Sequence, residues 1–307
     1  NKLFANTSIN YSNYYYYDKK FIQNRETNLR SNFIRDQVYN SDFHSGITDL
    51  SLKTDFNYQL IAGHILKFGI GFIDHLFTPN ASINRVSDSI NQFSETKNNY
   101  KIKALETYAY IEDDIEFSSR LKVNSGIRYT GFFVDGVYYN SFEPRISGRY
   151  LLTDHLGVKM AYSRMKQYAH LLSSSNVTFS SDLWVPSTSK VLPEVSDQIT
   201  LGSVFSTSQW EFSLETYYKT MGNLIEYSEG SSFLDNNLWE TKIENDGTGK
   251  AYGLEAYLAK NAGKTTGWIS YSLAWSYRKF GNINFGNWYP YKYDRRHDIG
   301  LVINHAF

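Results

Sequence analysis

Among the 307 residues of this sequence, the histidines are the first candidates for chemistry, because imidazole binds metal ions and transfers protons. None of them stands in an H-x-x-x-H or similar metal-binding spacing. We therefore predict that they lie in loops and at strand ends and bind no metal. The seven histidines are His44, His64, His75, His155, His170, His297 and His305.

Two short segments could also do chemistry. Glu112-Asp113-Asp114 could bind a cation, but it lies near a predicted tight turn, where carboxylates face water. Gly247-Thr248-Gly249-Lys250 superficially resembles a phosphate-binding loop, yet it lacks the full G-x-x-x-x-G-K-[ST] spacing and precedes a strand instead of a helix. We predict no catalytic residue and no cofactor, so the protein is not expected to be an enzyme.

The composition excludes several classes of protein. Lys and Arg number 31 and Asp and Glu also number 31, so no nucleic-acid partner is expected. Aromatic residues make up 17% of the chain, which argues against disorder. The sequence has no run of about 20 apolar residues, the length that a membrane-spanning helix needs. Strands remain as the predicted elements.

Apolar and polar residues alternate with a period of two along much of the chain, which is typical of strands with one apolar face. In residues 268–278, for example, Ile269, Tyr271 and Leu273 alternate with Ser270 and Ser272. Twelve strands are predicted. Their ranges are 2–15, 47–59, 64–77, 101–117, 120–134, 142–152, 155–168, 193–206, 209–220, 250–260, 265–278 and 294–307.

The predicted connections alternate between short and long. The long ones are polar stretches at 16–46, 78–100, 169–192, 221–249 and 279–293, with 135–141 as a short member of this set. Short turns on one rim and long loops on the other are typical of a membrane barrel, whose closure leaves no unpaired strand edge. We therefore predict an all-β fold, a transmembrane antiparallel up-and-down β-barrel. A soluble β-sandwich or propeller would explain the loop lengths poorly.

Nine charged residues fall on the polar faces of the predicted strands. An Arg or Lys on the lipid face at the bilayer midplane costs about 2–4 kcal/mol, so these side chains are expected to line the lumen. There they would contact water, one another, a plug or a solute. The lumen-lining candidates are Glu106, Arg128, Glu143, Arg145, Arg149, Lys159, Glu211, Glu215 and Glu255.

The predicted loops 169–192 and 221–249 carry side chains suited to stacking on a sugar, peptide or chelate and to hydrogen bonding with it. Trp and Tyr are equally common as anchors at membrane interfaces. The loop candidates for solute binding are His170, Trp184, Lys190, Tyr227 and Trp239.

From about residue 100 onward, an ordered series of segments resembles the barrel of TonB-dependent outer-membrane receptors, especially those of Bacteroidetes-type bacteria. Each segment is only moderately specific, and their order carries the resemblance. The segments are Asn124–Tyr129, Phe142–Ser147, Tyr162–Arg164, Gln167-Tyr168, His170–Leu172, Asp182–Ser187, Lys190–Glu194, Asp197-Gln198 and Tyr293–Asp298.

The resemblance implies a Gram-negative outer-membrane protein with a roughly 22-stranded barrel, filled by a plug domain that contacts TonB. Neither the plug nor a signal peptide is recognisable in residues 1–307, so we expect this range to be a partial β-barrel domain. The implied function is import of a scarce solute of the siderophore, oligosaccharide or peptide class. Outer-membrane lipid and TonB are the implied partners, and a surface lipoprotein partner stays open.

Two other functions also stay open. Twelve is an even number of strands, both predicted termini lie on the short-turn side and the last residue is the aromatic Phe307, so the chain could be a complete, passive, porin-like channel. It could also be a surface adhesive or structural barrel that binds a partner through its loops.

Overall fold

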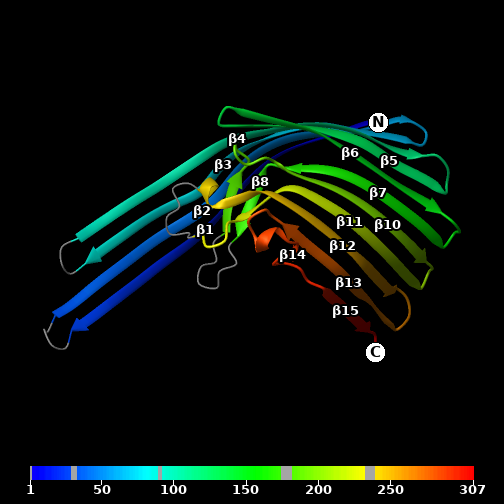
Figure 1. Cartoon of the computed structure of the whole chain (residues 1–307). Helices are drawn as coiled ribbons and strands as arrows, with labels where there is room; N and C mark the ends of the chain where they lie inside the picture. The colour runs from blue at the N-terminus through cyan, green and yellow to red at the C-terminus, as the bar shows by residue number, and fades with distance from the viewer. Residues whose placement is uncertain (1, 29–32, 89–91, 174–181, 232–238) are drawn as a thin grey trace.

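In the computed structural model, the chain forms a long antiparallel sheet that curves like part of a barrel wall (Figure 1). The structure describes residues 2–28, 33–88, 92–173, 182–231 and 239–307. The strands of this sheet are β1 (Leu3–Asn28), β2 (Phe33–Ile61), β3 (His64–Asp88), β4 (Gln92–Glu116), β5 (Leu121–Val134), β6 (Val137–Leu151), β7 (Leu156–Gln167), β10 (Glu194–Ser206), β11 (Trp210–Tyr227), β12 (Ile243–Lys260), β13 (Thr265–Lys279), β14 (Tyr289–Pro290) and β15 (His297–His305).

The order of the strands confirms the predicted up-and-down arrangement. Each of the twelve predicted strands is found, and the two-residue β14 adds a thirteenth to the sheet. Neighbours in the chain are neighbours in the sheet, except that β10 pairs with β7 and β15 pairs with β13. Within the described ranges, β1 pairs only with β2 and β15 only with β13, so the wall is open between these two edges.

Smaller elements lie in the connections on one rim. The strands β8 (Ala169–Ser173) and β9 (Asp182–Pro186) form a separate hairpin between β7 and β10. The 3-10 helices η2 (Trp239–Thr241) and η3 (Asn284–Gly286) follow β11 and β13. In the part of the chain that the structure describes, no helix has the length and apolar character needed to cross a membrane.

The short turns on the opposite rim are where the sequence predicts them, and three of them share one device. A Ser or Thr hydroxyl accepts a hydrogen bond from the backbone N–H three residues later, at 3.0 Å in each case. This local bond closes the turn without a glycine in a special conformation. The three pairs are Ser118 with Leu121, Thr153 with Leu156 and Thr207 with Trp210.

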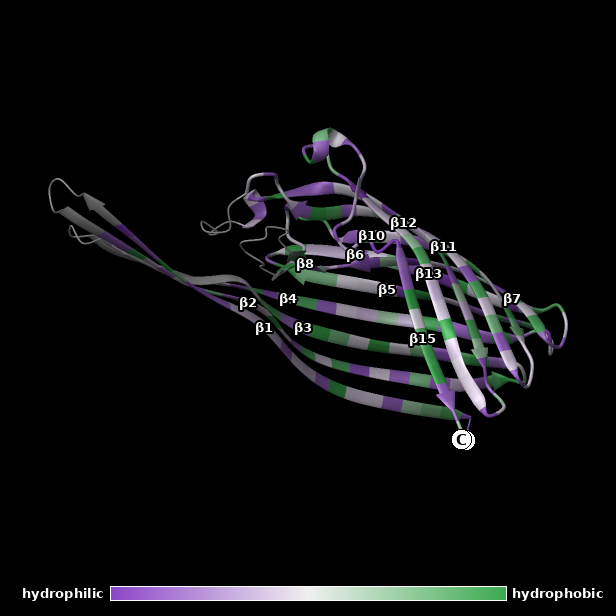
Figure 2. Ribbon diagram, turned by 90° about the horizontal axis from the view of Figure 1, so that it is seen from below, coloured by the Kyte–Doolittle hydropathy of each residue, from purple (hydrophilic) through white to green (hydrophobic). Residues whose placement is uncertain are grey.

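The alternation of side chains gives the sheet two chemically different faces, visible as alternating bands in Figure 2. Cross-strand partners share a face, so Ile127, Tyr129 and Phe142 lie on one side, which we call the outer face. The opposite side is the polar face. Its residues Phe77 and Phe132 pack in a buried cluster with Trp184 of β9, so the polar face is the concave one (Figure 1).

Two of the predicted long loops were wrong. Residues 16–46 and 78–100 mostly continue as strands, since β1 pairs with β2 and β3 with β4 far beyond the ends of the neighbouring strands (Figures 1 and 2). Backbone pairing needs no alternation of apolar residues, so a polar segment can extend a strand once the partner strand is in register. These four strands form a projection on the same rim as the β8–β9 hairpin.

The predicted loops 169–192 and 221–249 were partly wrong, because strands also extend into these stretches. The stretch 169–192 contains the β8–β9 hairpin, and Trp184 therefore lies on a strand. Within 221–249, β11 runs on to Tyr227 and β12 begins at Ile243. Residues 247–250, which superficially resemble a phosphate loop, are part of β12, and the ring of Phe280 lies against Gly247.

Candidate functional site: the polar face and the cap on its rim

The nine predicted lumen-lining residues share the polar face. In register, Arg128 lies opposite Glu143, Arg149 opposite Lys159, and Glu215 opposite Glu255. The alternation along each strand places the remaining three on the same side. The role of this face in lining a lumen remains a prediction. The remaining three are Glu106, Arg145 and Glu211.

One group on the polar face links three strands. The Arg128 guanidinium lies 3.5 Å from the Glu106 carboxylate and 3.9 Å from the centroid of the Tyr108 ring. The Tyr108 ring in turn covers Gly71 of β3, where a Cβ atom would come within 2.5 Å of the ring. A cation over an aromatic face is attracted by the ring quadrupole, so this stack fixes the direction of the arginine.

His75 extends this group and was not predicted as part of it. Its Nδ1 lies 2.8 Å from the Asp49 carboxylate and its Nε2 lies 3.7 Å from the Glu106 carboxylate. The imidazole is buried, with rings of Phe77 and Phe132 beside it. A lone histidine in a strand gave no signal in the sequence, because its two carboxylate partners lie on neighbouring strands. Within the described ranges, no group of three His, Asp or Glu side chains is placed to bind a metal ion.

A second group connects the polar face to the rim. The buried Glu143 carboxylate accepts a hydrogen bond from Thr130 at 2.7 Å, and the Thr130 hydroxyl is 2.9 Å from that of Tyr168. The Tyr168 ring stacks on Phe132 with centroids 4.8 Å apart. Tyr168 lies just beyond the end of β7, and burial, with smaller contributions from nearby carboxylates, raises the pKa of its phenol to about 12.

Toward the short-turn rim, the polar face surrounds an open hollow of about 770 Å³. Charged side chains from β4, β5, β6, β7 and β11 line it, including Glu116, Lys122 and Arg149. Lys159 and Glu215, also in this lining, form an ion pair. The described side chains thus offer both signs of charge within one hollow.

Four of the nine predicted residues have no ion pair or side-chain hydrogen bond within the described part of the chain. Arg145 and Arg149 are also exposed, so both guanidinium groups can reach a molecule on the concave side. The four residues are Arg145, Arg149, Glu211 and Glu255.

The acidic run after Tyr110 does not form one site. Cross-strand register places Asp113 on the outer face, where it lies 2.8 Å from His64 Nδ1. Asp114 lies on the polar face, 2.5 Å from Lys67 Nζ, and accepts a hydrogen bond from Asn124 at 2.6 Å. The carboxylates of Asp113 and Asp114 therefore point to different sides of the sheet, and each pairs with a neighbouring side chain.

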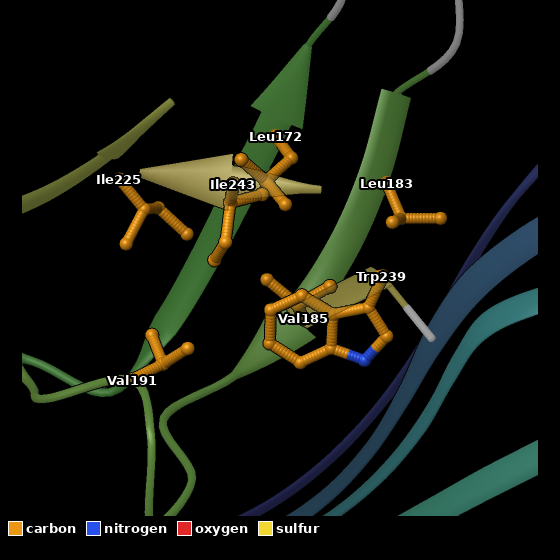
Figure 3. Close-up of a cluster of buried hydrophobic side chains, with 7 residues drawn as sticks. All are labelled: Leu172, Leu183, Val185, Val191, Ile225, Trp239 and Ile243. Atoms are coloured by element: carbon orange, nitrogen blue, oxygen red, sulfur yellow. The ribbon is translucent and has the colours of Figure 1, made fainter. Parts of the chain in front are cut away.

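All five loop candidates lie in or against a packed assembly on the rim, which we call the cap: the β8–β9 hairpin, the segment 187–192 and η2. Trp239 is only 3% exposed and packs with aliphatic side chains from β8, β9, β11 and β12 (Figure 3). Tyr227 packs against the same cluster. The buried members of this cluster are Leu172, Leu183, Val185, Val191, Ile225, Trp239 and Ile243.

His170 and Trp184 hold the hairpin from two sides. His170 is buried, with Nε2 2.9 Å from the Ser187 hydroxyl and Nδ1 3.4 Å from the Glu194 carboxylate. The Trp184 ring meets Tyr14 of β1 edge to face, 6.2 Å between centroids, and its backbone N–H donates to Ser45 of β2. Neither candidate therefore presents a free face: His170 packs within the cap, and Trp184 packs between the cap and the wall.

Lys190 is the candidate that faces out. Its ammonium lies 3.1 Å from Glu240, whose other oxygen accepts a hydrogen bond from Thr188 at 2.5 Å. Asn245 and Tyr139 bind the backbone carbonyls of Lys190 and Thr188. The turn 187–192 is thus fixed on both sides by residues distant in sequence, and Glu240 and Asn245 were not among the predicted site residues.

The outer face is the chemical opposite of the polar face. Large aliphatic residues are exposed along it, for example Ile299 at 68% and Leu301 at 61% on β15. Aromatic side chains flank this apolar band at both ends, with Trp210 near the short turns and Trp275 and Trp288 near the other rim. An apolar outer band between aromatic girdles, with a polar concave face, defines the wall of a transmembrane β-barrel.

Comparison with known proteins agrees with this class. The family model described as TonB dependent receptor-like, beta-barrel, matches residues 1–301. The chain therefore belongs to the TonB-dependent receptor β-barrel family, whose members are Gram-negative outer-membrane proteins. A search of curated proteins finds no sequence that matches this chain.

Solved structures show the same fold at low sequence identity. The siderophore receptor PirA from Acinetobacter baumannii is 15% identical with a TM-score of 0.60, over 96% of this chain and 48% of that one. The ferric yersiniabactin uptake receptor FyuA from Yersinia pestis is 13% identical with a TM-score of 0.60, over 94% and 46%. The RagAB peptide transporter is 11% identical with a TM-score of 0.54, over 93% and 35%. This chain thus spans less than half the length of these structures.

Proposed function

We propose that the protein is a TonB-dependent outer-membrane transporter that imports a scarce solute of the siderophore, oligosaccharide or peptide class. The observation that carries the proposal is the shared concave face of the nine charged residues, with apolar residues on the opposite face. A wall built in this way keeps charge away from lipid and offers it to whatever passes along the concave side. Family membership and the receptors and transporters of similar fold support this assignment.

In the proposed mechanism, the long-loop rim captures the solute and the polar face guides it inward. The exposed Arg145 and Arg149 and the carboxylates Glu211 and Glu255 would contact the solute or a plug domain. The paired groups, such as Lys159 with Glu215, would hold the wall in shape. TonB would act through the plug, and a surface lipoprotein would cover the rim in those members that have one.

The experiment is energy-dependent uptake in cells that express the protein at its native length. Cells would grow with a ferric chelate, an oligosaccharide mixture or a peptide digest as the limiting nutrient, with and without TonB. Uptake of one nutrient class that is lost with TonB supports the proposal. Uptake that continues without TonB and rises in proportion to concentration would instead identify a passive channel.

Charge variants connect the same assay to the polar face. Replacing Arg145 and Arg149 together by Glu reverses two exposed charges that have no partner in the described structure, so folding should be unaffected while uptake falls. Lys19→Glu, on the projecting part of β1, is the control for a charge reversal away from the polar wall: its ammonium is exposed and lies 3.9 Å from the Asp42 carboxylate. Equal uptake in all three proteins would exclude the two arginines from the solute path. If cells show no uptake with any of the three proteins but still attach to a surface, the adhesive function is favoured.

A further inference from the structure

The outer face of β12 carries two lysines that lie over aromatic rings, ten residues apart. The Lys260 ammonium lies 5.7 Å from the Trp210 ring centroid, next to the short turns. Lys250 lies on the same face near the other rim. Ten residues extend about 33 Å along a strand, which is about 25 Å along the membrane normal at the usual tilt of about 40°. The two lysines therefore lie at the two borders of the apolar band.

Around Lys250 the aromatic rings form a ladder across three strands. Tyr218 of β11 stacks on Tyr252 of β12 with centroids 6.3 Å apart, and Tyr252 stacks on Trp275 of β13 at 5.3 Å. Lys250 lies 4.5 Å from the ring centroid of Trp288 and 5.7 Å from that of Tyr277. The ladder gives this border a flat aromatic surface that continues into the apolar band.

A second cation lies over the same ladder. The Arg296 guanidinium lies 4.8 Å from the ring centroid of Trp275. Its carboxylate partner is Asp294, at 2.8 Å, which also accepts a hydrogen bond from the backbone N–H of Ser276. Asp294 and the side chain of Tyr277, which also hydrogen-bonds the guanidinium, therefore orient Arg296 without using all five of its N–H donors.

Basic side chains gather beside the aromatic ladder at this border. Within the described residues, the Lys250 ammonium has no carboxylate partner and no side-chain hydrogen bond, so its donors are free for a ligand. The segment between β14 and β15 adds Lys292 and Arg295 to Arg296, against the single acid Asp294. Lys260 at the opposite border lies over one ring and has no second cation beside it.

We propose that Lys250 and Arg296, above the aromatic ladder, bind the phosphate of a lipid headgroup in the outer leaflet. The ammonium and guanidinium would hold the phosphate at the interface, and the ladder with the apolar band below would contact the sugar or glycerol and the acyl chains. A lysine that only extends from the membrane border into water would need no second cation beside it and no continuous surface of aromatic rings. The site would hold the wall at a fixed depth in the membrane.

The test measures lipid binding by the protein purified in detergent from outer membranes at its native length. Native mass spectrometry would count bound lipid A with two phosphates, and a thermal scan would record the rise in unfolding temperature on adding it. We expect binding to weaken about fivefold for each cation replaced in Lys250→Gln and in Lys250→Gln with Arg296→Gln. Lys260→Gln is the matched control and should bind as the unmodified protein does.

Two further probes separate the sources of phosphate. Lipid A with both phosphates removed should bind the unmodified protein as weakly as lipid A binds the double variant. Inorganic phosphate should leave the unfolding temperature unchanged, and an increase equal to that from lipid A would overturn the lipid assignment. Unchanged lipid A binding in the folded Lys250→Gln and double variants would also overturn it, as would an equal loss in Lys260→Gln.

Discussion

Glu143 illustrates what a charge on the concave face requires. It is only 5% exposed, and burying a carboxylate is costly unless hydrogen bonds compensate for the lost water. Thr130 supplies one such bond, and Tyr168 reaches the same hydroxyl from beyond the end of β7. The Thr130 hydroxyl thus links the buried Glu143 of the wall to Tyr168 at the foot of the cap.

The phenol of Tyr168 provides a test of this connection through pH. Its pKa is raised to about 12 from an ordinary value of about 10, so folding favours the neutral phenol. That contribution to stability is complete below about pH 10 and is lost as the pH rises through 12. We expect the unfolding temperature of the unmodified protein to fall between pH 10 and 12, and that of Tyr168→Phe, which keeps the ring stack, to fall less. Tyr293→Phe, at an exposed position, is the control, and identical pH profiles for all three proteins would contradict the prediction.

The sequence was sufficient to place the charged residues but not to pair them. A period of two assigns each strand residue to a face, so all nine charges were correctly grouped. Pairing depends on register between strands, and Lys159 finds Glu215 across β10, 56 positions later in the chain. For Trp239 and His170, residue type alone could not distinguish a buried side chain from a ligand-binding one.

At the scale of elements, the cap is held by packing and its key residue is Trp239. Replacing a buried Trp by Ala removes its contacts and leaves a cavity, a cost of about 3–5 kcal/mol. We expect Trp239→Ala to loosen the cap, which would be measured as faster protease cleavage between β11 and β12 while the barrel strands stay intact. Phe285→Ala, at a side chain that is 98% exposed, should leave cleavage unchanged. Equal cleavage of Trp239→Ala and the unmodified protein would show that the cap does not depend on this cluster.

Strands β3 and β4 fit together because tyrosine rings of β4 lie over glycines of β3. At Gly71 a Cβ would lie within 2.5 Å of the Tyr108 ring, so Gly71→Ala must displace the ring and the Arg128 stacked on it. Overpacking of this kind costs about 1–3 kcal/mol, and we expect a lower unfolding temperature in detergent. Gly148→Ala in β6 is the control, because its Cβ would find its nearest neighbours at 3.8 Å. A similar unfolding temperature for both variants would contradict the explanation.

The extended strands show where element prediction failed. Residues 16–46 begin with the last two tyrosines of the run Tyr14–Tyr17 and continue with mainly polar residues, which resemble a loop because no apolar face is maintained. In the structure these residues pair in continuous register, Tyr17 with His44 and Phe21 with Asn40. Backbone hydrogen bonds to the neighbouring strand stabilise such a strand, and the sequence of one strand alone does not reveal this pairing.

At the scale of the whole molecule, the distribution of side chains between two faces is what makes this sheet a membrane wall. On β12, Leu254 lies on the outer face between the two lysines that mark the borders of the apolar band, and Glu255 points to the concave side. Neighbouring residues thus face lipid and water at nearly the same depth. The arrangement allows the two environments to be compared with one substitution at each position.

We expect Leu254→Arg to impair insertion into lipid vesicles, because a cation on the lipid face near the midplane costs about 2–4 kcal/mol. Glu255→Arg should insert normally, since it places the same side chain on the concave face, opposite Glu215. Insertion would be measured as the fraction of protein that resists unfolding in cold detergent and migrates faster on a gel. If both variants inserted equally well, the outer face of β12 would not contact lipid and the assignment of the two faces would be reversed or wrong. If only Glu255→Arg failed, lipid would lie on the concave side, which the burial of Glu143 on that face argues against.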